Sequence, residues 1–285
     1  MAPRILGLLV AVISLLSGAC SSPSTASSPP AASTIVFADG ATVVTKLGGS
    51  AYTNVVSGVG TGSVTYTSGT LSTATVNASS GAVTFVATGT TVITANKAAD
   101  ADHSSVTKSY TLTVVPSSFA IGNAFQGGKV AYILQSGDPG YATGGALHGL
   151  IAATADEMGM PWALAAYQST DVAGAHGTAI GTGLANTNAI VAQNGPGTGY
   201  AAGICDAYSV TDSGTVYSDW YLPSRDELDK LYVNQGAVGA FFAGTYYWSS
   251  SAFSATAGGI TYFTNGTTAG DPKNQNWSFR AVRSF

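Results

Sequence analysis

Apolar and hydroxyl-bearing residues alternate along most of the chain from Thr34 to Val115. Runs such as SVTYTS, TTVITANKA and SYTLTV place a larger side chain at every second position, and Gly, Asn, Asp and Ser separate them. A period of two is typical of strands that bury one face. ATVNASSGAVTFVA predicts two strands joined by a turn at residues 79–81. We therefore predict an all-β sandwich over residues 34–116.

The core of this sandwich is expected from its aliphatic residues, and we assign to it Val36, Val64, Val76, Val83, Val92, Ile93 and Leu112. The segment contains no cysteine, so it lacks the inter-sheet disulfide of antibody domains. Its pattern resembles the bacterial Ig-like domains of surface proteins. That resemblance implies a stalk without a catalytic role.

The pattern changes after Pro116. GGKVAYILQ, HGLIAAT, YYWSSS and GGITYFTNG predict strands, and WSFRAVRSF predicts one continuous final strand. A helix is expected over residues 185–195, capped by Asn186 and ended by Gly195. A second helical stretch over residues 198–210 has four residues at core-facing spacing: Ala201, Ile204, Cys205 and Tyr208. We predict an α+β domain over residues 119–285.

The stretch DWYLPSRDELDKLY, residues 219–232, predicts a helix with a capping box. The Ser224 hydroxyl can cap the helix, and Glu227, three residues later, can accept from the N–H of the cap residue. Leu228, Leu231 and Tyr232 recur at helical spacing and mark the buried face. Helix capping and solvation explain the carboxylates of this stretch better than acid–base catalysis does.

Five blocks follow one another in this second domain: GTG-ANTNAIVA, AAGICDAY, SDWYLPSRDEL, YYWSSS and RAVRSF. In this order they resemble the Lcl C-terminal domain family, formerly a domain of unknown function. The resemblance implies a C-type-lectin-like fold. It also implies a secreted or surface-exposed binding module, which bacterial adhesins that recognise glycosaminoglycans sometimes carry.

The N-terminus predicts export. Arg4 supplies a positive charge, residues 5–16 an apolar run and residues 17–19 the small residues before Cys20. This arrangement resembles a bacterial lipoprotein signal, which implies cleavage and acylation at Cys20 and a lipid anchor in the cell envelope. Ordinary signal-peptidase cleavage, with Cys20 discarded, is the alternative. Residues 21–33 are rich in Ser and Pro and predict an extended tether.

Composition and spacing give little support for an enzyme. Only 8% of residues are charged and the net charge is −4, which argues against a nucleic-acid partner. Cys205 lies in an apolar helical pattern, which favours a buried, inert thiol. His148 and His176 have no zinc-site spacing. Asp271 and the amides after it are a weak substitute for the calcium motifs of C-type lectins, so we assign no cofactor and leave calcium open.

Aromatic and amide side chains gather late in the chain, where rings can stack on sugars and amides can bind hydroxyls. We assign Trp220, Tyr247 or Trp248, and Phe279 to the core. The wider aromatic group also contains Tyr246, Phe253, Tyr262 and Phe263. The predicted ligand-binding residues are Asn265, Lys273, Asn274, Gln275, Asn276, Trp277 and Arg280.

The sequence therefore predicts a non-enzymatic cell-surface lipoprotein whose Ig-like stalk displays a lectin-like head. From residue 119 onward there are six basic and eleven acidic side chains, a net charge of −5. Arg280 and Arg283 are also expected on opposite faces of one strand. We predict a neutral extracellular glycan or a protein as ligand, with weak retention on heparin. The alternative is an envelope assembly component whose head mediates homo-oligomerisation.

Overall fold

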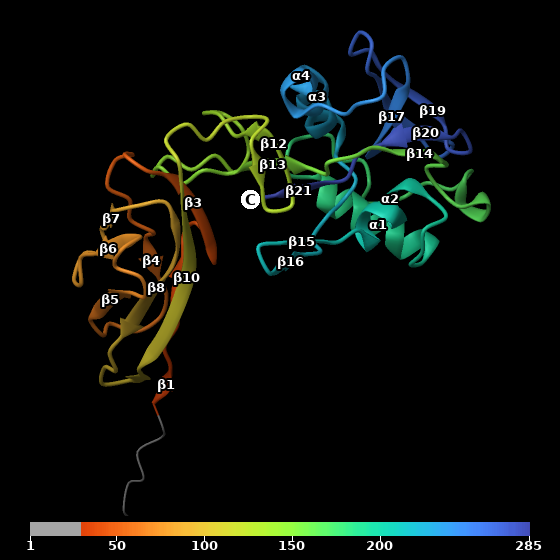
Figure 1. Ribbon diagram of the computed structural model, residues 1–285. Helices are drawn as coiled ribbons and strands as arrows, with labels where there is room; N and C mark the ends of the chain where they lie inside the picture. The colour runs from red at the N-terminus through yellow and green to blue at the C-terminus, as the bar shows by residue number, and fades with distance from the viewer. Residues whose placement is uncertain (1–29) are drawn as a thin grey trace, which may run out of the picture.

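The computed structural model describes residues 30–285 (Figure 1). The chain is mostly β-structure with few helices, arranged as a sandwich followed by a head. Among residues 30–285, no helix has the length and apolarity that crossing a membrane requires. The predicted signal peptide, Cys20 and most of the tether lie outside the described residues.

The sandwich is built on a four-stranded sheet in which β3 runs parallel to β10 and the other neighbours are antiparallel. In sheet order the strands are β3 (Thr42–Lys46), β10 (Val106–Val115), β8 (Gly89–Lys97) and β5 (Val64–Ser68). Opposite it lie the short pairs β2 (Val36–Phe37) with β4 (Val56–Ser57), and β6 (Ala74–Val76) with β7 (Val83–Phe85). The β6–β7 pair confirms the predicted turn at residues 79–81.

The sandwich core differs from the predicted one at two valines. Val36 is 53% exposed and Val92 is 45% exposed, so assigning them to the core was wrong. Their chain neighbours Phe37 and Ile93 are buried instead. Successive side chains of a strand point to opposite faces, so two adjacent residues cannot both enter the core. The other predicted core residues are buried or pack against the cluster: Val64, Val76, Val83 and Leu112.

The ordered sandwich begins before the predicted boundary at Thr34. Strand β1 (Ala31–Ala32) pairs in parallel with β9 (His103–Ser104), at the end of the sandwich far from the head (Figure 1). Ser33 is buried. The last residues of the predicted tether are therefore part of the folded sandwich.

The head contains two larger sheets. The four-stranded sheet has the order β11 (Ala124–Phe125), β12 (Gly128–Ile133), β13 (Gly149–Ala152) and β21 (Val282–Ser284). The five-stranded sheet has the order β14 (Glu157–Met160), β20 (Trp277–Phe279), β17 (Tyr246–Ala252), β18 (Ala257–Tyr262) and β19 (Thr268–Pro272). A separate hairpin joins β15 (Val210–Asp212) to β16 (Thr215–Tyr217).

The prediction of one continuous strand in WSFRAVRSF was wrong. The segment divides at Arg280 and Ala281 into β20 and β21, which belong to different sheets. The expected placement of Arg280 and Arg283 on opposite faces of one strand therefore fails. The division lets one short segment complete both sheets of the head.

Helices connect and cover the sheets of the head: η1 (Ala165–Tyr167), α1 (Gly183–Asn194), α2 (Ala201–Ala207), α3 (Arg225–Val233) and α4 (Gln235–Val238). Helix α1 ends at Gly195 as predicted, where a φ of 83° suits glycine. The capping role assigned to Asn186 was wrong. It lies inside α1, where its buried side chain bonds both backbone groups of Gly177.

The predicted capping box at the start of α3 is confirmed. The Ser224 hydroxyl accepts from the Glu227 N–H, and the Glu227 carboxylate accepts from the Ser224 N–H at 2.7 Å. Leu228 and Leu231 are buried. The core assignments of Trp220, Tyr247, Trp248 and Phe279 are also confirmed, with each side chain at most 1% exposed.

Sandwich and head meet through a small apolar junction. Val44 of β3 forms an isolated antiparallel bridge with Leu147 of the head. Around it, Val115 and Phe119 pack with Val130 and with the ring of Phe285. Figure 1 shows the C-terminus between the two domains. The junction thus includes the last residue of the chain.

Candidate functional site

Three aromatic rings form a row across three adjacent strands of the five-stranded sheet. Tyr246 of β17 lies opposite Tyr262 of β18, and the parallel register between β17 and β20 brings Trp277 to its other side. The ring centroids of Tyr246 and Tyr262 are 4.7 Å apart, and those of Tyr246 and Trp277 are 4.9 Å apart. We call these three residues the aromatic row.

The aromatic row lies on the face of the five-stranded sheet that also contributes residues to the core of the head. Strand alternation puts Tyr246 on the same face as Trp248, and Trp277 on the same face as Phe279. Trp248 and Phe279 are fully buried under residues of α1 and α2, whereas Tyr246 and Trp277 are only partly buried. The covering helices therefore stop short of the row, and its rings reach the surface.

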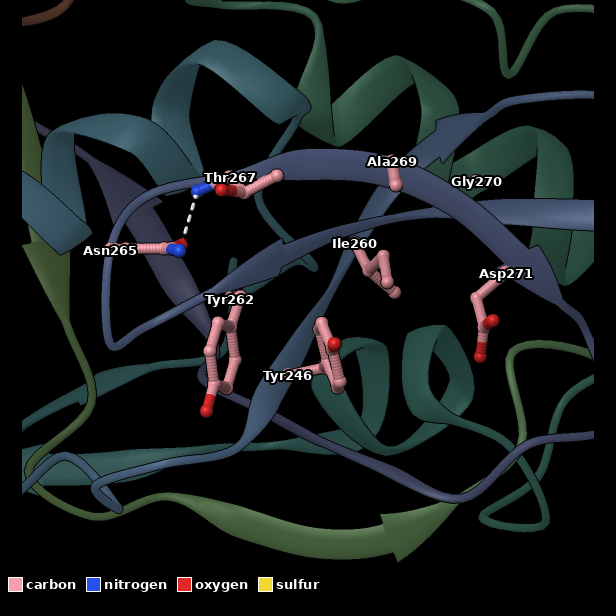
Figure 2. A pocket seen from close by; sticks show the side chains of 8 residues that line it. All are labelled: Tyr246, Ile260, Tyr262, Asn265, Thr267, Ala269, Gly270 and Asp271. Atoms are coloured by element: carbon pink, nitrogen blue, oxygen red, sulfur yellow. Dashed lines mark hydrogen bonds between the residues drawn. The ribbon is translucent and has the colours of Figure 1, made fainter.

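A pocket of about 450 Å³ opens beside this row. Figure 2 shows the rings of Tyr246 and Tyr262 side by side, with Asn265 near one end and Asp271 at the other. The remaining lining residues are Ile260, Thr267, Ala269 and Gly270. Its volume falls within the range of small-molecule sites, and its walls combine rings with a few polar groups.

The polar groups of the pocket are held in place by local hydrogen bonds. The Trp277 Nε1–H donates to Asp271 Oδ2 at 2.6 Å and so joins the row to the carboxylate. The Asn265 side-chain oxygen accepts from the Thr267 N–H at 3.0 Å (Figure 2). A ring surface with an oriented carboxylate and amide suits a ligand that has an apolar face and hydroxyl or amine donors.

The structure brings together only some of the predicted ligand-binding residues. Asn265 lines the pocket and Trp277 belongs to the row. Asn274, Gln275 and Asn276 are exposed in the turn between β19 and β20. Assigning Lys273 and Arg280 to a ligand-contacting surface was wrong, because they are 1% and 0% exposed.

The ammonium group of Lys273 is bound by other residues inside the head. Its Nζ donates to the carbonyl oxygen of Thr170 at 2.7 Å and lies 4.8 Å from the ring centroid of Trp162. Desolvation by burial lowers the pKa of this amine, while the charge of Asp171 acts in the opposite direction. The side chain therefore ties a loop to the core and offers no charge to a ligand.

Arg280 is the centre of a buried network. Its Nε lies 2.5 Å from Asp156 Oδ1, and the Tyr247 hydroxyl donates to the other oxygen of the same carboxylate. The guanidinium also donates to the backbone carbonyls of Ala153 at 2.9 Å and Ala240 at 2.6 Å. This network fixes the loop after α4 against the sheet.

The same burial limits the positive charge that the head offers at its surface. Of its six basic residues, Lys273, Arg280 and Arg283 are buried, and Arg283 forms a two-point contact with Asp219 at 2.7 and 2.8 Å. Arg225, which is exposed, pairs with Asp226 at 2.9 Å. Glycosaminoglycans bind clustered, exposed cations, and four of the six basic residues of the head are buried or paired with a carboxylate.

The Cys205 thiol and the His176 ring of the head are buried and hydrogen-bonded, respectively. Cys205 is 1% exposed, and burial raises the pKa of its thiol well above the ordinary value. Both ring nitrogens of His176 have partners, Asp171 at 3.1 Å and the carbonyl of Ala252 at 3.2 Å. Within residues 30–285 no group of three or more His, Cys, Asp or Glu side chains could hold a metal ion.

The residues predicted from the sequence to bind the ligand do not include Tyr246, Tyr262 or Asp271. The two tyrosines belong to the late aromatic group considered for stacking on sugars, and Asp271 belongs to the polar loop 264–276, which was favoured for ligand binding without singling out this residue. Strand alternation alone pairs Tyr246 with Trp248 and Ile260 with Tyr262 on common faces. The missing information was the register between the strands, since only the register brings these rings to one pocket.

No family model matches the sequence, and no curated protein matches it. A fimbrial protein from Bacteroides ovatus ATCC 8483 is similar in structure, with 11% identity, 89% of this chain and 69% of that chain covered, and a TM-score of 0.39. An EHEC O157:H7 intimin mutant has 13% identity and a TM-score of 0.21, and the match covers 85% of this chain and 87% of that chain. An intimin–Tir90 complex has 14% identity, coverage of 85% and 87%, and a TM-score of 0.19. At such TM-scores the likeness supports no conclusion, so the resemblance to the Lcl C-terminal domain family stays a prediction.

Proposed function

We propose that the chain is a non-enzymatic surface protein whose sandwich displays the head, and that the head binds a saccharide at the aromatic row. The observation that carries the proposal is the row itself. Two of its rings, those of Tyr246 and Tyr262, line a pocket of about 450 Å³, and the third ring, that of Trp277, packs against Tyr246. Aromatic faces provide large contact area at low conformational cost.

The rest of the sequence fits this proposal. The predicted export signal and the Ser/Pro-rich tether favour presentation outside the cytoplasm, with Cys20 as a lipid anchor in the cell envelope. The aromatic row lies in the sheet of the head that β19 borders, on the side of the molecule away from the sandwich (Figure 1). A ligand of another cell or of the surrounding matrix would meet this side of the head first.

A glycan array with purified protein tests the proposal. The wild-type protein should bind a defined set of saccharides, and the double substitution Tyr246→Ala with Tyr262→Ala should abolish this binding. Tyr141→Ala is the matched control, because Tyr141 is 42% exposed and lies outside the pocket. Binding that survives the double substitution would remove the row from the site. Heparin should be retained weakly by both proteins.

A further inference from the structure

We propose that the pocket beside the aromatic row selects an amino sugar that carries a free, protonated amine. The inference rests on the proposed function and narrows it to a glucosamine-type saccharide. It follows from the charge of the pocket, which is negative, whereas a site for acidic polysaccharides must be positive. Three features of the described residues support it.

The first feature is a carboxylate without a cationic partner. Asp271 accepts one hydrogen bond, from Trp277 Nε1 to its Oδ2, and among the described residues its side chain makes no ion pair. It lines the pocket and is partly exposed. One oxygen is therefore left to accept from a ligand, and a charged donor forms the stronger bond.

The second feature is the absence of competing positive charge. None of the eight described residues that line the pocket is basic. Lys273 is only two residues from Asp271, but its Nζ is bound to the carbonyl of Thr170 and covered by Trp162. The pocket therefore presents one negative charge, which repels sulfated or carboxylated sugars and attracts an ammonium group.

The third feature is the row itself. The faces of Tyr and Trp attract a cation through their ring quadrupoles, in addition to the Asp271 carboxylate. Tyr246 and Tyr262 both line the pocket, with ring centroids 4.7 Å apart and ring planes inclined by 33°, so the pocket offers two adjacent rings. A single lysine side chain from a protein would cover one ring, whereas a saccharide can contact both. We therefore assign the site to a sugar.

Calorimetric titration with two tetrasaccharides tests the inference, one of glucosamine and one of N-acetylglucosamine. At mildly acidic pH, where the free amine is protonated, the wild-type protein should prefer the glucosamine tetramer by about tenfold, the contribution of one charge-assisted hydrogen bond. Asp271→Asn should abolish this preference while retaining the weaker binding of the acetylated tetramer. Asp206→Asn, at an exposed acid of α2, should leave the preference unchanged.

The outcomes separate the two proposals. Equal affinity for both tetramers, or a preference for the acetylated one, would overturn the amine assignment and leave a saccharide site. Binding of neither tetramer, together with an empty glycan array, would overturn the proposed function as well. Tighter binding of a tetralysine peptide than of the glucosamine tetramer would assign the pocket to a basic protein and reject the sugar. Tryptophan fluorescence melting of Asp271→Asn verifies that the variant is folded.

Discussion

The sandwich and the head differ in what they bury. The sandwich core consists of aliphatic and aromatic side chains, and among its described residues Lys97 is the one buried charged residue. The interior of the head encloses Glu227, Lys273 and Arg280, together with the side chain of Asp156. Both domains come from a chain in which only 8% of residues are charged.

The difference follows from how each domain provides hydrogen-bond partners for its backbone N–H and C=O groups. Long ladders pair most backbone groups of β8 and β10 in the sandwich. The head has longer connections, whose carbonyl and N–H groups need other partners. Arg280 bonds the carbonyls of Ala153 and Ala240, and Glu227 accepts from the Gly181 N–H at 2.8 Å. Buried charges in the head therefore replace ladder hydrogen bonds.

The largest expected effect comes from removing the Arg280 guanidinium. Arg280→Met should destabilise the head by about 3–5 kcal/mol, because it leaves the Asp156 carboxylate buried without its cation. All four tryptophans lie in the head, so fluorescence-detected urea unfolding reports on this domain. Arg225→Met, at an exposed arginine, should change stability by less than about 0.5 kcal/mol. Equal effects of the two substitutions would contradict the structural role of Arg280.

In the sandwich, the matching test removes an apolar side chain. Ile93→Ala should destabilise this domain by about 2–5 kcal/mol, because it opens a cavity in a fully buried position. Hydrogen exchange of the β8 and β10 amides measures the effect. The neighbouring Val92→Ala, at a side chain 45% exposed, should cost less than about 0.5 kcal/mol. Similar exchange in both variants would mean that the assigned faces of β8 are incorrect.

The smallest expected effect concerns the buried carboxylate of Glu227. Desolvation raises its pKa, and hydrogen bonds from Ser224 and Gly181 oppose the shift only in part. The folded head then binds this proton more tightly than the unfolded chain, so its contribution to stability falls as pH rises past the ordinary value of 4.5. The free energy of unfolding of the wild type, relative to that of Glu227→Gln, should decline over that pH window. A flat or rising difference would show that the carboxylate is not penalised by burial.

Local signals allowed much of the fold to be predicted. The strands of the sandwich follow from alternation, and the capping box of α3 follows from four consecutive residues. The wrong predictions arose where the buried face of a strand had to be chosen, or where residues far away in the sequence determine whether a side chain is buried. Val92 and Ile93 are equally apolar, and only the pairing of β8 selects which one is buried.

The site was less accessible to sequence reasoning than the fold. The aromatic row requires strands β20, β17 and β18 to be neighbours, although β20 is the last of them in the chain. Arg280 looked available for a ligand because its partner Asp156 is 124 residues away. Local composition can therefore indicate which residue types gather, but tertiary pairing decides which of them stay free.

The division of the final segment between two sheets has a consequence for biosynthesis. β20 and β21 leave the ribosome after the other strands of the head, and each is needed by a different sheet of the head. The sandwich strands end at Val115, so that domain can fold while most of the head is still being made. The head must wait for Trp277–Ser284, and a chain that loses these residues to a nonsense mutation or to proteolysis would carry a folded sandwich with an incomplete head.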